Sequence, residues 1–380
     1  MIHICKVETS KQLSEFVRLP HILYAGDPYY VPQLDIERHT HFSRKHNPYF
    51  DHADAELFLA RNAAGQPVGR ISAQIDFEET DHKTIGHFGV LEADTPETMH
   101  LLLTEAEEWL NSKGITKVTG PYSLSINDEV GLLVDGFTSP PRLMMNYAKP
   151  WYKEALEHAG YTKAQDLYAY SLDVSKGLPQ TIDRMSRTAL NKEGLVERKI
   201  NMQNLSQDLH TVIDIFNDAW ANNWGFTPMT GAEIAYMVKN LRPIIDADLA
   251  RIVELDGRPI AMIVALPDIN EGIKDLGGKL FPFGWLKLLA RLKGHKLKGA
   301  RVVLMGVRQE YQGGSFGGSV AIAMMRNLYK IGTAKGICGV ELSWILEDNT
   351  AMIKLLEMMG TTHYKTYRIY EKSLKYHLNK

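Results

Sequence analysis

A glycine-rich loop between a strand pattern and a long apolar helix pattern is the stretch best suited to chemistry. Residues 302–307 form an apolar run that predicts a strand, and glycines follow at positions 313, 314, 317 and 318. Glycine lets the backbone come close to a ligand, and the free N–H groups at the positive end of a helix bind anions. The loop therefore predicts a diphosphate site, with a tight ligand-free turn as the alternative.

Length, composition and charge limit the classes of protein to consider. The chain has 380 residues, enough for two domains, and 44% hydrophobic with 23% charged residues is ordinary for a folded soluble protein. A net charge of −2 excludes a globally basic nucleic-acid coat. Only Cys5 and Cys338 are available, so neither a disulfide framework nor a thiolate zinc site is expected, and the chain fits a reducing compartment without a metal.

The chain shows no targeting or membrane-spanning pattern. Residues 1–10 lack the basic-then-apolar order of a secretion signal. Apolar runs such as residues 259–267 are far shorter than the ~20 residues that span a bilayer. We therefore expect a cytoplasmic protein, at most attached peripherally to the inner face of the membrane.

Periodicity predicts the same order of elements in both halves of the chain. A hairpin signal around Ala64-Gly65-Gln66 in the first half has a counterpart at Asp256-Gly257 in the second. The first half predicts strands at 2–7, 55–63, 66–77, 84–91 and 115–118, and helices at 9–24 and 96–113. The second half predicts strands at 195–201, 250–255, 259–266, 300–307, 339–344 and 365–371, and helices at 209–220, 231–245, 317–332 and 350–359.

The expected fold class follows from this order. Strands and helices alternate while the hairpins are antiparallel, so each half predicts a mixed α/β fold with a mostly antiparallel sheet. The predicted domains are residues 1–174 and 182–380, joined by a linker at 175–181, with an insertion at 277–300 in the second.

The glycine-rich loop resembles the acyl-CoA binding motif of the GNAT acyltransferase superfamily, Arg/Gln-x-x-Gly-x-Gly/Ala. The six matching positions run from Gln312 to Gly317, and Ser315 stands where the consensus has its first glycine. The resemblance implies two tandem GNAT-like domains, of which the second binds coenzyme A thioesters. The implied donor-binding residues are Gln312, Gly313, Gly314, Ser315, Phe316, Gly317 and Gly318, with backbone N–H groups of Met305 and Val307 at the acyl carbonyl.

Residues 341–360 resemble the second GNAT motif, a strand followed by Asn and a short helix that ends in Gly. The resemblance implies that Asn349 contacts the coenzyme A arm, and its position also favours a helix N-cap. The family often has a Tyr on this helix as the acid for the leaving thiolate, and the matching position here is Leu356. Tyr364 is the expected replacement, unless the thiolate leaves unassisted.

Further clusters resemble the tandem GNAT family that includes bacterial ceramide synthase-like proteins. The family implies acyl transfer from coenzyme A to an amine, a long-chain sphingoid-like amine in those members, and hence a role in lipid metabolism. Two other hypotheses stay open: a non-catalytic acyl-CoA-binding module, favoured by Ser315 and Leu356, and a peripheral membrane adaptor. The clusters are 27–32, 47–50, 68–73, 120–121, 127–137, 220–226, 279–284 and 344–349.

Amide formation needs a base that takes the proton of the amine. Glu347, beyond the strand that carries Trp344, is our first candidate, and a solvated carboxylate near a helix start is its alternative. Glu233 is the second candidate, and it also fits a capping box with Thr230. His363 is the third candidate, and a surface or packing histidine is its alternative.

Aromatic residues predict the wall of the acceptor site. We expect Trp220, Asn223, Trp224 and Trp344 to contact the amine substrate, against an aromatic cluster that only packs. The first half carries acidic residues after its 84–91 strand, Glu92 to Glu97, where the second half has glycines. It should therefore not bind coenzyme A, and we expect it to shape the acceptor site or the interdomain cleft.

The insertion at 277–300 predicts a basic amphipathic helix. Trp285, Leu288, Leu289 and Leu292 recur at helical spacing among basic residues that no acid interrupts. Such a helix can lie on an anionic membrane, roof an acyl-chain channel or pack on its own protein with a solvated rim. No nucleic-acid partner is expected, because one short basic segment makes no extended patch.

Overall fold

The computed structural model describes residues 1–79, 81–294 and 296–374, which form two compact units of discontinuous chain. The described part of the first unit comprises Met1–Leu167, Ile273–Trp285 and residues 365–374, and the second comprises Tyr168–Gly272 and Leu286–Tyr364. The predicted domains, residues 1–174 and 182–380 with a linker at 175–181, stay a prediction.

The first unit contains a mostly antiparallel sheet in the order β1-β2-β3-β4-β5-β13. Among the described residues of this path β4 and β5 pair in parallel, and β6 pairs with β13 beside the path. The C-terminal strand belongs to this sheet from Lys365 onward, since Tyr370 lies opposite Gly120. The strands are β1 (His3–Lys6), β2 (Ala53–Arg61), β3 (Pro67–Asp76), β4 (Ile85–Ala93), β5 (Lys117–Gly120), β6 (Leu132–Asp135) and β13 (Thr362–Ser373).

Helices of the first unit begin at recognisable caps. The side chain of Thr9 accepts a hydrogen bond from the Gln12 N–H, and the Gln12 side-chain oxygen accepts one from the Thr9 N–H, which together form a capping box. Thr95 caps α3 by accepting from the Thr98 N–H. The helices are α1 (Ser10–Leu23), α2 (Asp35–His41), η1 (Pro48–Asp51), α3 (Pro96–Ser112) and α4 (Tyr152–His158). β7 (Thr162–Asp173) begins in this unit and ends in the other.

The sheet of the second unit repeats this plan, with the order β12-β11-β10-β9-β8. Its one parallel pair in these strands is β11 with β12. The predicted hairpin at Asp256-Gly257 is confirmed, because Arg258 lies opposite Leu255. The strands are β8 (Leu195–Lys199), β9 (Ala250–Leu255), β10 (Arg258–Pro267), β11 (Gly299–Val307) and β12 (Gly339–Leu346).

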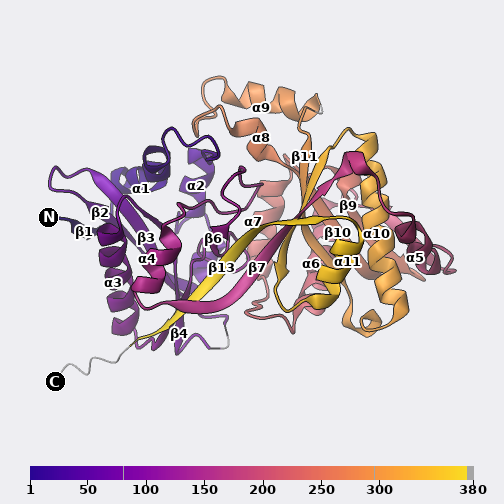
Figure 1. Ribbon diagram of the computed structural model, residues 1–380, viewed down its shortest axis with the longest axis horizontal. Helices are drawn as coiled ribbons and strands as arrows, with labels where there is room; N and C mark the ends of the chain where they lie inside the picture. The colour runs from indigo at the N-terminus through magenta and orange to yellow at the C-terminus, as the bar shows by residue number, and fades with distance from the viewer. Residues whose placement is uncertain (80, 295, 375–380) are drawn as a thin grey trace. The chain divides into compact units, whose positions relative to one another are not determined.

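Helices of the second unit include one that the sequence interpretation missed, α5. It lies beside α10, where the Ser319 hydroxyl donates to the Met185 carbonyl at 2.8 Å and accepts from the Ala189 N–H at 2.9 Å (Figure 1). The helices are η2 (Val174–Lys176), α5 (Gln180–Leu190), α6 (Leu205–Trp220), α7 (Gly231–Leu241), η3 (Ala247–Leu249), η4 (Gln309–Tyr311), α10 (Ser315–Ala334) and α11 (Thr350–Met358). Two more, α8 (Ile269–Ile273) and α9 (Gly284–Lys293), have most of their residues in this unit and the rest in the first.

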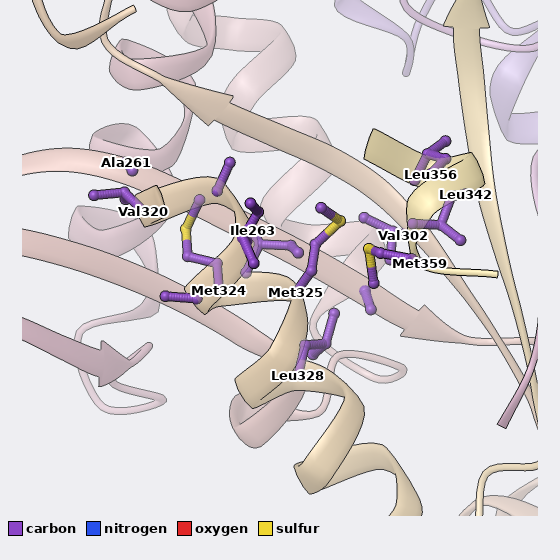
Figure 2. Packing of buried hydrophobic residues seen from close by; sticks show 14 of the residues in the cluster. Ala261, Ile263, Val302, Val320, Met324, Met325, Leu328, Leu342, Leu356 and Met359 are labelled. Atoms are coloured by element: carbon purple, nitrogen blue, oxygen red, sulfur yellow. The ribbon is translucent and has the colours of Figure 1, made fainter. Parts of the chain in front are cut away.

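The core of the second unit lies between the sheet and helices α10 and α11. Met324 and Met325 of α10 lie near Ile263 of β10 and Val302 of β11, and Leu356 of α11 lies near Leu342 of β12 (Figure 2). A separate core in the first unit centres on Phe16, Leu19 and Leu59.

The two units confirm the predicted repeat of element order and the mixed α/β class. Three antiparallel strands, a helix and a parallel strand occur as β2–β4, α3 and β5, and again as β9–β11, α10 and β12. No helix within the described ranges has the length and apolar character needed to cross a bilayer.

Candidate functional site

The parallel ladder between β11 and β12 stops halfway along both strands. Their recorded register runs from Gly299 opposite Gly339 to Val302 opposite Leu342. β11 continues to Val307 and β12 to Leu346, so each strand extends past its last paired residue. The edge of β11 that faces away from β10 is therefore available from residue 303 onward to another binding partner.

Backbone N–H and C=O groups alternate in direction along β11, and this alternation shows which residues direct theirs to that edge. The Arg308 N–H donates to the Ile260 carbonyl at 2.8 Å, so residues 308, 306 and 304 direct their backbone groups to β10. Met305 and Val307 direct theirs to the opposite edge. Their carbonyls accept bonds from the Trp220 indole at 3.1 Å and the Gln312 side-chain amide at 2.7 Å. The N–H groups of Met305 and Val307 point to the same edge, as a carbonyl-binding role requires.

The glycine-rich loop leads from this edge into α10 and leaves the helix start open. Gly314 is the N-cap and provides no side-chain hydrogen bond, and the first turn contains no acidic residue. The N–H groups at Ser315, Phe316 and Gly317 belong to the turn that has no partners within a helix. A Cβ at Gly313, Gly314 or Gly318 would meet nothing within 4 Å, so this side of the loop is open. An anion can reach these donors.

Two glycines of the loop are required by its backbone. Gly313 has φ of +76°, in the left-handed region that glycine adopts without strain. A Cβ at Gly317 would lie 2.0 Å from the Tyr311 carbonyl oxygen, so only glycine lets α10 start against this turn. Phe316 is half-buried and packs edge-to-face on Tyr311, with ring centroids 6.0 Å apart. Ser315 occupies the first helical position and is exposed.

The end of α6 is fastened to this loop. The Gln309 N–H donates to the Asp218 carboxylate at 2.8 Å, and the Gln312 amide donates to the Ala219 carbonyl at 3.3 Å. Trp220 therefore lies beside Met305, and its ring packs on Phe216 at 4.9 Å. The Asn223 N–H donates to the Trp220 carbonyl at 2.8 Å, which places Asn223 in the turn after the helix, next to the half-buried Trp224.

The corresponding helix start in the first unit differs. α3 has Thr95 as a side-chain cap, and the Thr98 hydroxyl donates to the Asp94 carboxylate at 2.6 Å. Glu97 adds another negative charge to its first turn. A phosphate would meet a capped and acidic helix end there, which favours the view that the first unit does not bind coenzyme A.

Two of the three base candidates, Glu233 and His363, make the capping and packing contacts that were the alternatives to a catalytic role. Glu233 is in a capping box, in which its carboxylate accepts from the Thr230 N–H and hydroxyl, both at 2.8 Å. The His363 ring packs on Tyr168 and Tyr170, with centroids 4.7 and 5.5 Å away. Glu347 is half-buried in the turn after β12. Asn349, two residues on, caps α11 by accepting from the Met352 N–H at 3.1 Å.

The position on α11 where the family often has Tyr holds a buried side chain that cannot donate a proton. Leu356 is fully buried and points into the core of the second unit (Figure 2). Tyr364 is half-buried, and its hydroxyl donates to the Glu341 carboxylate.

That carboxylate belongs to a buried ion pair that sequence reasoning missed. Arg301 and Glu341 face each other across β11 and β12 with 2% and 1% of their side chains exposed, and Arg301 Nε lies 3.4 Å from Glu341 Oε1. The Ser343 hydroxyl donates to Glu341 at 2.6 Å and accepts from Arg301 Nε at 2.8 Å. The guanidinium also lies 5.2 Å from the ring centre of Trp344. The only sequence signal was a charged residue inside each apolar strand.

A half-buried carboxyl of the first unit gives a pH-dependent prediction. Burial raises the pKa of Asp128 to about 6, against the opposing effects of His41 and Arg38. A carboxyl whose folded pKa exceeds its unfolded value is protonated more readily in the folded state, so its charge destabilises the fold as pH rises through this range. Asp128→Asn should therefore increase the free energy of unfolding at pH 7.5 by about 1–3 kcal/mol.

Chemical denaturation at several pH values checks this prediction. The gain should shrink as pH falls toward 4.5, while the exposed Asp135→Asn should show neither the gain nor its pH dependence. A loss of stability in Asp128→Asn at pH 7.5 would contradict the argument.

Comparisons with known proteins identify relatives over nearly the whole chain, although no family model matches. The chain is 43% identical over 377 residues to the bacterial ceramide synthase of Caulobacter vibrioides, covering 98% of both chains. It is 43% identical over 370 residues to protein YghO of Escherichia coli, covering 95% of this chain and 93% of the relative.

Solved structures show the same fold at low sequence identity. A tandem GNAT protein from the clavulanic acid biosynthesis pathway matches with a TM-score of 0.59 and 12% identity over 99% of both chains. A GCN5-related N-acetyltransferase from Sphaerobacter thermophilus matches with a TM-score of 0.55 and 12% identity over 98% of this chain and 96% of that one.

Proposed function

The chain belongs to the tandem GNAT family of the Caulobacter ceramide synthase, and on that premise we propose that it transfers an acyl group from a coenzyme A thioester to an amine. The observation that carries the proposal is the uncapped, glycine-lined start of α10 next to the free edge of β11. The relative's name supports a long-chain, sphingoid-like amine as acceptor, and hence a reaction of lipid metabolism.

The donor is held by backbone groups in this proposal. The diphosphate contacts the N–H groups between Gly313 and Gly318, and the acyl carbonyl accepts from the N–H of Met305 or Val307. Asn349 lies at the cap of α11, near the end of β12, and contacts the arm of coenzyme A while it caps the helix. Gln312 acts indirectly, because its amide ties the loop to β11.

The reaction needs one proton removed and one supplied. The neutral amine attacks the thioester carbon, a C–N bond forms, and the carbonyl oxygen becomes an oxyanion stabilised by the β11 N–H groups. Glu347 takes the proton of the amine, the C–S bond breaks, and the thiolate takes a proton from Tyr364. Tyr364 must release its bond to Glu341 to do so, and the phenol is then reprotonated from water.

Aromatic side chains form the acceptor wall in this proposal. Trp220 lies beside Met305 and therefore beside the proposed position of the acyl carbonyl. Asn223 and Trp224 follow in the next turn, and Trp344 lies on β12 past its last residue paired with β11. A long apolar chain gains free energy from such surfaces as water is excluded.

Thiol release from acyl-CoAs of increasing chain length, with and without long-chain amino alcohols, tests the function. Amine-dependent release with formation of the amide supports it. Donor binding without turnover would replace it with the acyl-CoA-binding module that Ser315 and Leu356 favour. Absence of coenzyme A binding would refute both.

The anion site has its own test in a matched pair of variants at the helix start. Gly314→Asp should raise the KM for acyl-CoA roughly 30- to 100-fold, because a carboxylate would face the diphosphate at short range. Gly314→Asn, of the same shape but neutral, should raise KM much less, because its side-chain cap only competes for the N–H donors and adds no negative charge. Both should keep the wild-type melting temperature, since φ of −111° and ψ of 164° suit an Asp or Asn cap. Equal KM values for the two variants would place the diphosphate elsewhere.

A further inference from the structure

The segment 279–298, which the proposed function does not use, exposes a concentrated set of apolar side chains. Of the twelve large hydrophobic residues that are exposed in the described chain, five lie between positions 281 and 289. Phe281 and Phe283 are each 69% exposed, and α9 itself contains no buried residue. We define the α9 surface by these five residues: Phe281, Phe283, Trp285, Leu286 and Leu289.

One side of α9 packs on the protein and leaves this surface to the outside. A Cβ placed on Gly272 of α8 would lie 3.0 Å from Leu288 and 4.0 Å from the Arg291 side chain, so these residues turn inward. At 100° per residue, Trp285, Leu289 and Leu286 span an arc of about 100° on another side of the helix. The predicted stripe thus divides, with Leu288 packed and Trp285 exposed.

The charged residues of the segment that carries the α9 surface have one sign. Sequence positions 276–300 contain no Asp or Glu. Lys279, Lys287, Lys293 and Lys296 are all exposed there. Exposed apolar side chains with exposed lysines beside them in the sequence complement the interface of a membrane, where apolar chains lie beneath anionic headgroups.

The aromatic residues are suited to leave water. The Trp285 indole N–H already donates to the Pro282 carbonyl at 3.1 Å, so burying the ring leaves no hydrogen-bond donor without an acceptor. Phenylalanine rings gain free energy from any apolar contact. A nucleic acid would use the lysines but would leave the leucines on α9 exposed.

We propose that the α9 surface inserts into the interface of a bilayer that contains anionic lipids, with the lysines at the headgroups. The proposal stands apart from the catalytic one, since no residue of the α9 surface belongs to the donor or acceptor site. It would bring the chain to the surface on which lipid-like substrates reside.

Flotation of the full chain with vesicles tests the proposal. We expect binding to phosphatidylcholine vesicles that contain phosphatidylglycerol at low salt, much weaker binding at high salt and little binding to pure phosphatidylcholine. Phe281→Ser/Phe283→Ser should lower the partition coefficient roughly tenfold or more. Lys287→Gln and Lys293→Gln should each lower it roughly fivefold, on anionic vesicles only.

Matched control variants distinguish binding through the α9 surface from nonspecific binding to vesicles. Phe77→Ser removes another half-exposed aromatic residue, and Lys192→Gln another exposed lysine, and both should bind as the wild type does. Absence of vesicle binding at low salt would overturn the proposal, as would unchanged binding of the double Phe variant. Donor binding and turnover of water-soluble substrates without vesicles should be the same in all variants, so a failure here is distinct from a failure of the proposed function.

Discussion

Glu347→Gln is expected to lower kcat for acyl transfer by about 10²- to 10⁴-fold with little change in the KM for acyl-CoA. An aliphatic amine is mostly protonated at neutral pH, so attack requires a group that accepts its proton. Glutamine keeps the size of Glu347 in the turn between β12 and α11 but cannot accept that proton. Steady-state kinetics with a fixed amine measure the effect.

The pH profile distinguishes a base from a structural residue. The deficit of Glu347→Gln should shrink as pH rises, because more of the amine is then free without help. A purely structural defect would be constant with pH. Glu357→Gln, an exposed neighbour on α11, should retain wild-type kinetics.

The competing candidates give outcomes that would overturn this assignment. Glu233→Gln should keep both stability and turnover, since glutamine also completes a capping box. If Glu233→Gln loses turnover while Glu347→Gln retains it, Glu233 is the base. Tyr364→Phe should lower kcat with little change in the KM for acyl-CoA, and an unchanged kcat would show that the thiolate leaves unassisted.

Local patterns sufficed for most elements of the fold. β9 has the predicted bounds because two strand-forming runs meet at Asp256-Gly257, a strong turn signal. α5 was missed because its buried side is Ile182, Ser186 and Ala189, which does not look apolar in sequence. Its partner surface on α10, with Ser319 between the helices, exists only in the folded chain.

The candidate site likewise has parts that local sequence patterns predict and parts that they do not. The glycine-rich loop could be predicted because glycine spacing reports backbone geometry directly, as the φ of Gly313 and the contact at Gly317 show. The pairing of Arg301 with Glu341 was not, because it depends on a parallel register between residues forty positions apart. The entry of the C-terminal strand into the first unit's sheet is likewise a long-range pairing that periodicity does not encode.

The buried ion pair leads to the largest expected effect on stability. Arg301→Leu should lower the free energy of unfolding by about 3–5 kcal/mol, because the Glu341 carboxylate then remains in the interior without this cation. Arg301→Leu/Glu341→Leu should recover more than half of the loss, since apolar side chains of similar volume replace both charges. Denaturant unfolding of the two single variants and the double variant provides the cycle.

The cycle also bears on the site, because Arg301 and Glu341 lie one residue before the last recorded pair of β11 and β12. If this ion pair fixes the point at which β11 and β12 separate, its removal should also affect donor binding. The double variant should therefore regain stability but bind acyl-CoA more weakly than the wild type. Additive losses in the two single variants, or a cost below about 1 kcal/mol for Arg301→Leu, would show that the charges act independently. Recovery of stability and donor affinity together would mean that apolar packing holds this point of the sheet equally well.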